Sequence, residues 1–405
     1  MKDQKQSWFS IVAPGILLAA TGVGAGDLLT STLAGSEVGL TVLWAGIVGA
    51  FLKYYLTEGI ARWQLATDTT ILEGWSWKLG GWIRWVFMIY LVFFSVVVGA
   101  ALVSACGVAG AGLLPIGDLE QSRLVWGILH SCVGFGVAWL GSFGAFEKIM
   151  SVLIGTMFVT VIFTAVAVAP SLSEIGMGLI PQIPAEGTSW VIAVLGGVGG
   201  TVTMLSYGYW IQERGRRGAA MLPICRIDLA VGNGMTALFG LAVIIIGARV
   251  ELEGQGSGLA LQLAAQLEGV IGPAGKWIFL IGFWAAVFSS LLGVWQSIPY
   301  LFADFVDLRT HKPGVRRNRD LRKTTAYRGG LAFIAVAPLA FLSWPVKQIQ
   351  MTYGIFGAFF LPLLALTLLI MNNKKGWVGS DFLSSKFTNV VLAAALALFA
   401  YLSLP

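Results

Sequence analysis

Charged residues are scarce in this 405-residue chain: Lys, Arg, Asp and Glu together make up 11% of it, whereas apolar and aromatic residues make up 57%. A soluble domain of this size could not bury that much apolar surface. The composition therefore excludes a soluble globular protein and indicates an integral membrane protein.

Cysteine and histidine are also rare. Cys106, Cys132 and Cys225 are dispersed in or beside apolar segments, which argues against a disulfide framework or a zinc site. His130 lies in an apolar segment and His311 in a basic loop, so we expect a structural role for the first and a solvated role for the second. The sequence contains no nucleotide-binding loop, nucleophile elbow or metal-hydrolase spacing, and we expect neither enzyme activity nor a cofactor.

Long apolar runs are abundant, and each is long enough to cross about 30 Å of hydrocarbon. Eleven spans are predicted, at residues 9–34, 40–63, 81–109, 123–142, 147–169, 188–213, 227–249, 274–303, 327–344, 350–372 and 387–404. The loops between them are too short to fold as a soluble domain. We therefore expect a single membrane domain over residues 1–405.

The positive charges set the predicted orientation. Most Lys and Arg residues, including those of the segment RTHKPGVRRNRDLRK, fall on the side of the N-terminus, and only Arg123, Arg249, Lys276 and Lys347 fall on the other side. By the positive-inside rule we expect a cytoplasmic N-terminus and an outside C-terminus. The basic loop is expected to touch anionic membrane lipid rather than nucleic acid. The absence of an organellar presequence favours a bacterial-type inner membrane.

Two glycine clusters interrupt spans that should otherwise be continuous helices. The stretch AATGVGAGDLLTST, residues 19–32, breaks the first span and carries Asp27, and the related GVGGT, residues 197–201, breaks the sixth. Glycine also serves close helix packing, but these two clusters occupy corresponding places in spans of opposite direction. This pattern predicts two inverted five-helix repeats, residues 9–169 and 188–372, followed by an eleventh helix at 387–404.

An unwound turn exposes backbone carbonyls that can bind a cation, and a carboxylate inside a membrane is costly unless it faces a polar cavity or a partner. We therefore expect a substrate or ion site where the two broken helices meet. Lys53 and Glu58, both in the second span, are candidate coupling or gating residues. Glu58 can pair with Arg62 four residues later, which leaves Lys53 to snorkel or to pair with Asp27. A Lys53–Asp27 pair would provide a fixed positive charge in place of a coupling ion.

The segment APGILLAATGVGAGDLLTSTLAGSEVGLTVLWAGIVGAFLKYYLTEGIARWQLAT resembles the first two helices of the Nramp family of divalent-metal transporters. The resemblance extends to FEKIMSVLIGTMFV in the fifth span, to Met204 in the sixth, and to the order and number of helices. It implies an all-α integral membrane protein with a LeuT-like fold, eleven transmembrane helices, and helices 1 and 6 broken. It also implies transport of a divalent metal such as Mn²⁺, Fe²⁺ or Mg²⁺ by alternating access.

The chain departs from the family pattern at its metal site. The family's Asp-Pro-Gly-Asn turn aligns with residues 24–27, so that Gly24 replaces the ligand aspartate and Asp27 replaces the asparagine. In the sixth helix the family's methionine aligns with Met204, its carbonyl-donating alanine with Thr201, and its Pro-His pair with Leu205 and Ser206. The family's glutamine in the tenth helix falls near Gly354. The third span lacks the family's acidic pair, so the usual proton route is missing.

The resemblance and the residues together predict a substrate site, whose members are Thr21, Gly24, Asp27, Thr201, Met204, Ser206 and Tyr207. Asp27, Met204 and Thr201 are the expected metal ligands. A thioether favours manganese or iron, although methionine also fills gaps in apolar cores. A site with so few donors makes partly hydrated Mg²⁺ a candidate as well. The alternatives are a transporter of a non-metal solute or anion, with Lys53 replacing a coupling cation, and a receptor that no longer transports. We expect a monomer.

Overall fold

The structure, a computed structural model, describes residues 8–141, 143–184, 187–250, 258–310 and 321–402. The side chains of residues 8–11, 25–27, 143, 259, 270, 271 and 310 lie outside this description. Within the described residues every regular element is a helix and none is a strand. The predicted all-α class is confirmed.

The described residues of the first half of the chain form eight α-helices and three short π or 3₁₀ segments. Their bounds are α1 Trp8–Gly22, η1 Ala25–Thr30, α2 Ser31–Val38, η2 Gly39–Val42, α3 Leu43–Thr67, α4 Ile71–Gly74, η3 Trp75–Leu79, α5 Gly81–Leu113, α6 Leu119–Leu140, α7 Phe143–Ala167 and α8 Leu172–Gly178.

The second half begins with another interrupted helix. Its elements are α9 Thr188–Gly197, η4 Val202–Leu205, α10 Ser206–Glu213, η5 Ala219–Met221, α11 Leu222–Gly247, α12 Leu259–Ile271, α13 Pro273–Thr310, η6 Leu321–Lys323, α14 Thr325–Val336, η7 Ala337–Phe341, α15 Val346–Ala358, α16 Phe360–Met371, α17 Lys375–Val378 and α18 Lys386–Leu402.

Among the described residues, eight helical segments are long and apolar enough to cross a membrane. Three shorter apolar helices accompany them, at Val12–Gly22, Thr325–Phe341 and Lys386–Leu402. One of the eight, Leu28–Thr67, joins the end of the first predicted span to the second. The count of eleven spans therefore remains a prediction.

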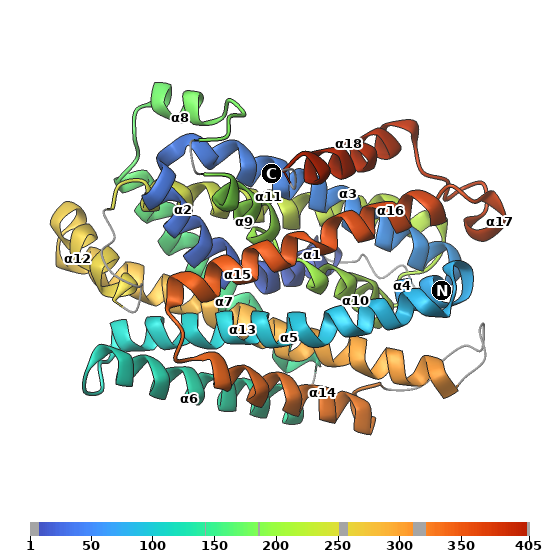
Figure 1. Ribbon diagram of the computed structural model, residues 1–405, viewed down its shortest axis with the longest axis horizontal. Coiled ribbons are helices and arrows are strands. Elements are labelled where there is room, and N and C mark those ends of the chain that lie inside the picture. The colour runs from blue at the N-terminus through green and yellow to red at the C-terminus, as the bar shows by residue number, and fades with distance from the viewer. Residues whose placement is uncertain (1–7, 142, 185–186, 251–257, 311–320, 403–405) are drawn as a thin grey trace.

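The long helices run roughly side by side along the longest axis of the molecule (Figure 1). The 33 residues of α5 extend about 50 Å at 1.5 Å per residue, more than the hydrocarbon thickness. The short helices α8 and α12 lie at one end of this axis, and α4 and α17 lie at the other (Figure 1). The long axis is thus the direction in which the helices can cross a bilayer.

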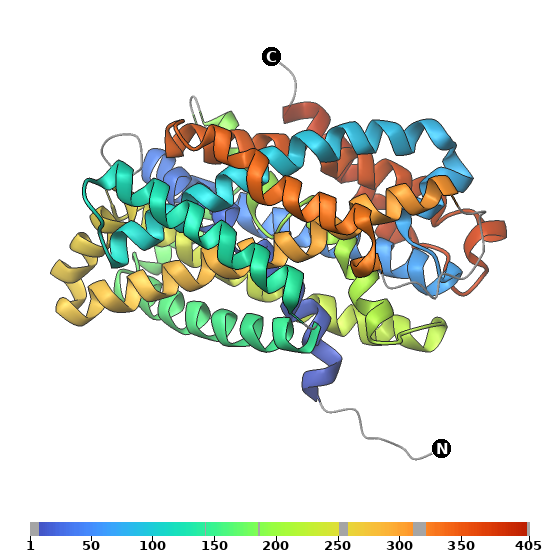
Figure 2. The same ribbon diagram turned by 90° about the horizontal axis from the view of Figure 1, so that it is seen from below.

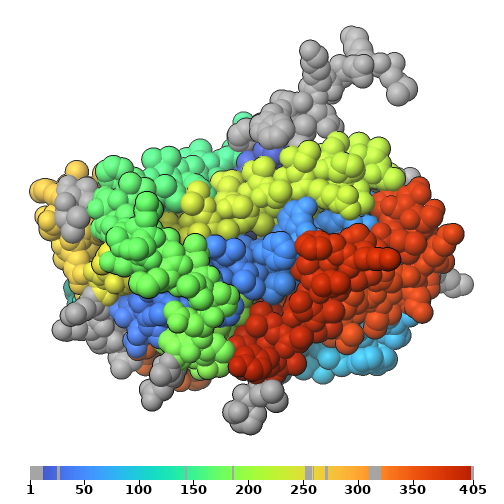
Figure 3. Space-filling model, turned by 90° about the horizontal axis from the view of Figure 1, so that it is seen from above, coloured from blue at the N-terminus to red at the C-terminus, as the bar shows by residue number. Residues whose placement is uncertain are grey.

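The two interrupted helices lie inside the bundle. The first helix, α1, packs against α11 and α13, and α9 packs against α15 and α3. Figure 2, turned by 90°, shows the blue start of α1 extending from the lower edge of the bundle toward the N-terminus. The loop after α8 covers one end of the molecule, where the indole Nε1 of Trp44 donates to the Gln182 carbonyl at 3.0 Å. The space-filling view shows this segment in green over the blue start of the chain, with α18 in red beside α3 (Figure 3).

Candidate functional site

The first membrane helix is interrupted between α1 and η1. The α1 helix ends at Gly22, and Gly24 adopts φ −150° and ψ −127°, outside the helical region. The π-helical segment η1 begins at Ala25, and π-helical turns within membrane helices are frequent at functional sites. The predicted break in helix 1 is confirmed.

Two serines of α13 satisfy carbonyls that the break leaves without helical partners. The Ser290 hydroxyl donates to the Thr21 carbonyl at 2.6 Å, and the Ser289 hydroxyl donates to the Ala20 carbonyl at 3.3 Å. A Cβ atom on Gly24 would lie 2.0 Å from the Cβ of Ser290. Helix α13 therefore approaches the break so closely that position 24 has no room for a side chain.

The sixth membrane helix is interrupted between α9 and η4. The α9 helix ends at Gly197, and Gly199 and Gly200 then adopt φ values of +78° and +72°. Two successive residues in this left-handed region are easily formed only by glycine. A Cβ atom on Gly22 would lie 2.6 Å from the carbonyl carbon of Gly199. The backbones of the two breaks are therefore in direct contact, as the inverted-repeat interpretation expects.

Lys53, on α3, is fully buried and reaches the second break. Its ammonium donates to the Gly196 carbonyl at 3.0 Å and also to the Val198 carbonyl. These carbonyls belong to the C-terminal end of α9, where the helix dipole favours a positive charge. The expectation that Lys53 snorkels is wrong, because its side chain is 0% exposed. The proposed pairing with Asp27 involves a side chain outside the described residues.

Glu58, five residues further along α3, does not join the break. Its Oε1 accepts from Arg226 Nε of α11 at 2.9 Å, and its Oε2 accepts from Arg62 Nε at 3.2 Å. The predicted pair between Glu58 and Arg62 is therefore present. The Glu58 carboxylate links α3 to the start of α11, and its gating role stays a prediction.

Buried hydroxyls are concentrated at the two breaks. Thr21 lies at the end of α1, Thr201 lies in the second break, Thr203 follows it in η4, and Ser206 begins α10; each is at most 3% exposed. Their hydroxyl oxygens have no hydrogen-bond partner among the described residues. A buried polar atom without a partner is uncommon and calls for a ligand or an ordered water. Three members of the predicted site, Thr21, Thr201 and Ser206, thus carry buried hydroxyls near the two breaks.

Met204 and Tyr207 follow the second break but differ in their surroundings. Met204 lies in η4 and is completely buried in the apolar core. The Tyr207 hydroxyl points away to α11, where it donates to Asp228 Oδ2 at 2.8 Å. Tyr207 therefore supports the packing of α10 on α11, whereas the role of Met204 as a ligand stays a prediction.

Asp27 has its backbone in η1, while its side chain lies outside the described residues. The described part of the chain contains no group of three or more His, Cys, Asp or Glu side chains placed to hold a metal. An ion at the junction would accordingly depend on Asp27, hydroxyls, carbonyls and the Met204 thioether. The role of Asp27 as the main carboxylate of the site stays a prediction.

The tenth membrane helix carries a buried glutamine four residues before Gly354, the position near which the family's glutamine is expected. Gln350 of α15 is fully buried; its Nε2 donates to the Ala101 carbonyl at 2.9 Å, and its Oε1 has no partner among the described residues. Gly354 instead packs against α9, since a Cβ on Gly196 would lie 2.2 Å from the Gly354 carbonyl oxygen. Helix α15 also carries the exposed Gln348, and the sequence alone does not show which of the two glutamines is buried.

A second polar cluster fixes the first half of helix 1. Asp228 of α11 is fully buried; its Oδ1 accepts from the Gly15 N–H at 2.6 Å, and its Oδ2 accepts from Arg216 at 2.7 Å. Burial lowers the pKa of Arg216, but the neighbouring Asp228 and Tyr207 raise it, and the net direction is upward. The guanidinium therefore stays charged at physiological pH. The sequence did not predict this cluster. Pro14 removes an N–H and loosens the helix there, but it does not indicate that Asp228 binds the helix at this point.

His130 is held by two tryptophans. Its Nε2 accepts from Trp284 Nε1 at 2.8 Å, and its Nδ1 lies 2.7 Å from the Trp126 carbonyl. This arrangement fits a neutral imidazole that donates through Nδ1. The contacts support the expected structural role of His130, while His311 lies outside the described residues.

An all-helical bundle with two interrupted helices in contact at its centre defines the LeuT class of membrane transporters. A family model described as "Natural resistance-associated macrophage protein-like" matches residues 15–404, and the chain belongs to this family. The Nramp family is a family of membrane transporters rather than enzymes, and the chain is accordingly a multi-pass membrane protein.

Solved structures share the fold at low sequence identity. A manganese transporter of Eremococcus coleocola, in complex with an aromatic bis-isothiourea compound, is 14% identical, with a TM-score of 0.79 over 99% of this chain and 87% of that one. MhsT in complex with L-phenylalanine is 15% identical, with a TM-score of 0.63 over 98% and 97%. An uncharacterized protein of Pasteurella multocida is 23% identical over 318 residues, 75% of this chain and 68% of its own length.

Proposed function

We propose that the chain transports a divalent metal cation by alternating access, with the site at the junction of the two breaks. The observation that carries this proposal is the direct contact between Gly22 and Gly199, near four buried hydroxyls that have no partner among the described residues. Carbonyl and hydroxyl oxygens at this position are suitable ligands for a hard or borderline cation. Family membership supports the same class of substrate.

The donor set suggests how the ion is held. Asp27 supplies the carboxylate, Thr201 supplies oxygen, and Met204 supplies a thioether that favours Mn²⁺ or Fe²⁺. Gly24 contributes backbone only, because Ser290 occupies the space of a side chain there. So small a set leaves room for bound water, which also makes Mg²⁺ a candidate.

The charge of Lys53 favours a second candidate, a transporter of a non-metal solute or anion. Its buried ammonium at the end of α9 is a fixed positive charge beside the junction. Such a charge repels a divalent cation and attracts a carboxylate or another anion. The hydrogen bonds to the α9 carbonyls partly offset the charge of the Lys53 ammonium, so transport of a divalent metal remains the first candidate.

The proposed oligomeric state, membrane topology and coupling follow from the sequence pattern. We propose a monomer in the inner membrane, with a cytoplasmic N-terminus and inverted repeats at residues 9–169 and 188–372. The third helix, α5, has no acidic residue. We therefore propose metal entry without the proton route of the family.

Thermal stabilisation of the detergent-purified protein tests the proposal, because a ligand that binds the folded state raises its unfolding temperature. MnCl₂ and MgCl₂ at up to millimolar concentration should stabilise the wild type and the Asp381→Asn control, in which an exposed loop carboxylate is removed. Asp27→Asn should lose the effect, and Met204→Ala should weaken Mn²⁺ more than Mg²⁺. Stabilisation by small carboxylates or inorganic anions, with none by divalent ions, would favour the second candidate.

A further inference from the structure

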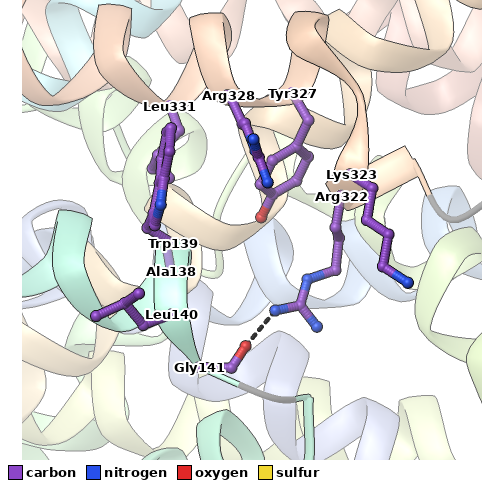
Figure 4. Close-up of a pocket in the computed structure, with 9 residues that line it drawn as sticks. All are labelled: Ala138, Trp139, Leu140, Gly141, Arg322, Lys323, Tyr327, Arg328 and Leu331. Atoms are coloured by element: carbon purple, nitrogen blue, oxygen red, sulfur yellow. Dashed lines mark hydrogen bonds between the residues drawn. The ribbon is translucent and has the colours of Figure 1, made fainter.

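A polar cavity of about 270 Å³ lies where α6 ends and α14 begins, away from the two helix breaks. Its floor and walls come from Ala138 to Gly141 at the end of α6, from η6, and from the first turns of α14 (Figure 4). Both chain segments reach the same membrane face as the start of α1 in the proposed topology.

Among the described residues that line the cavity there are three cations, Arg322, Lys323 and Arg328, and no Asp or Glu. Arg322 donates through Nη2 to the Gly141 carbonyl, which holds its guanidinium against the end of α6 (Figure 4). The guanidinium of Arg328 lies over the Trp139 ring, 5.0 Å from its centroid. These contacts hold two of the cations in place, as a preformed anion site requires.

The cavity adjoins a surface suited to hydrocarbon. Leu140 is 83% exposed and Trp139 is 43% exposed at the end of α6. Further along the two helices, Leu129, Val133 and Val336 are also exposed and apolar. A tryptophan at the end of an apolar helix is typical of the headgroup level of a membrane. An occupant would therefore have a negative group in the cavity and an apolar portion beside α6.

We propose that this cavity binds the phosphate of an anionic glycerophospholipid, with Arg322, Lys323 and Arg328 around the phosphate and the acyl chains along the exposed face of α6. Basic pockets between membrane helices on the cytoplasmic side are suited to such head groups. The lipid bridges α6 and α14, which already meet through the Ser131 hydroxyl and the Ala335 carbonyl at 2.9 Å. The site is independent of the transported substrate.

Native mass spectrometry of the delipidated full chain tests this proposal with phosphatidylglycerol, and with phosphatidylcholine of the same acyl chains. Wild type should retain phosphatidylglycerol preferentially. Lys323→Gln/Arg328→Gln should weaken its binding by roughly 30-fold, since each cation near a membrane surface contributes on the order of fivefold in affinity. The matched control is Lys374→Gln/Lys375→Gln, which removes two exposed cations from another loop on the same membrane face.

Several outcomes of this experiment would contradict the lipid proposal. An equal loss in the control pair, or equal retention of phosphatidylcholine by wild type, would overturn the proposal. Competition by inorganic phosphate or glycerol 3-phosphate at similar concentration would show a site for soluble phosphate and would also overturn it. If the double variant fails to fold, Arg328→Gln alone should still weaken phosphatidylglycerol binding by about fivefold, and unchanged binding would contradict the proposal.

Discussion

Ser290 of α13 stands where a side chain on Gly24 of the first break would have to be: a Cβ at position 24 would lie 2.0 Å from the Cβ of Ser290. The same serine donates to the Thr21 carbonyl. Helix α13 therefore leaves no room for a side chain at position 24 and at the same time satisfies a carbonyl at the end of α1.

Gly24→Ala should therefore destabilise the protein by about 1–3 kcal/mol, the usual cost of overpacking. Gly234→Ala on α11 is the control, because no heavy atom lies within 4 Å of a Cβ there. Thermal unfolding followed by tryptophan fluorescence measures both, and Ser290→Gly in the Gly24→Ala background should restore stability. Equal stability of the two alanine variants would contradict this prediction, because it would show that α13 can move aside at little cost.

Lys53→Met should destabilise the protein by about 1–3 kcal/mol, because it leaves carbonyls of Gly196 and Val198 without a donor in the interior. Lys276→Met, which removes a partly exposed lysine, serves as the comparison in the same unfolding measurement. If the ammonium replaces a coupling cation, transport by Lys53→Met should also become dependent on added Na⁺ or K⁺. A Lys53→Met variant that is as stable as Lys276→Met, and whose transport does not respond to these ions, would show that Lys53 has neither role.

Asp228→Asn should loosen the first half of helix 1, since Asp228 binds the Gly15 N–H and the charged Arg216. Removing one partner of a buried ion pair costs about 3–5 kcal/mol. Cys225, buried and 3.7 Å from an Arg216 nitrogen, reports the change. In a Cys132→Ser background, maleimide should label Cys225 several-fold faster in Asp228→Asn than in the parent. Unchanged labelling would mean that the cluster does not restrain this region.

Metal entry should carry no protons, because α5 has no acidic side chain to relay them. In proteoliposomes with an internal pH-sensitive dye, Mn²⁺ influx should leave the internal pH unchanged. Influx should increase with an inside-negative potential, which supplies ~2.3 kcal/mol per elementary charge at 100 mV. Acidification that follows metal entry would place a proton path elsewhere in the protein.

The helix breaks could be predicted from the sequence because glycine clusters in apolar helices are a local signal, and Gly199 and Gly200 indeed need positive φ. The pair of Glu58 with Arg62 followed from helical spacing alone. The partner of Lys53 could not be predicted, since backbone carbonyls at a helix end carry no side-chain signature. The positions of Ser290 and Gln350 depend on the register of packed helices, which a single sequence does not specify.

Uptake of Mn²⁺ into proteoliposomes under an inside-negative potential tests the central claim most directly, with wild type, Asp27→Asn and the Asp381→Asn control reconstituted at equal density. The account predicts saturable uptake by wild type and by Asp381→Asn, and uptake at the level of empty liposomes for Asp27→Asn. Wild-type rates in Asp27→Asn, or no Mn²⁺ or Mg²⁺ uptake by a wild type that retains its fold, would contradict the proposal of a metal path between the two helix breaks.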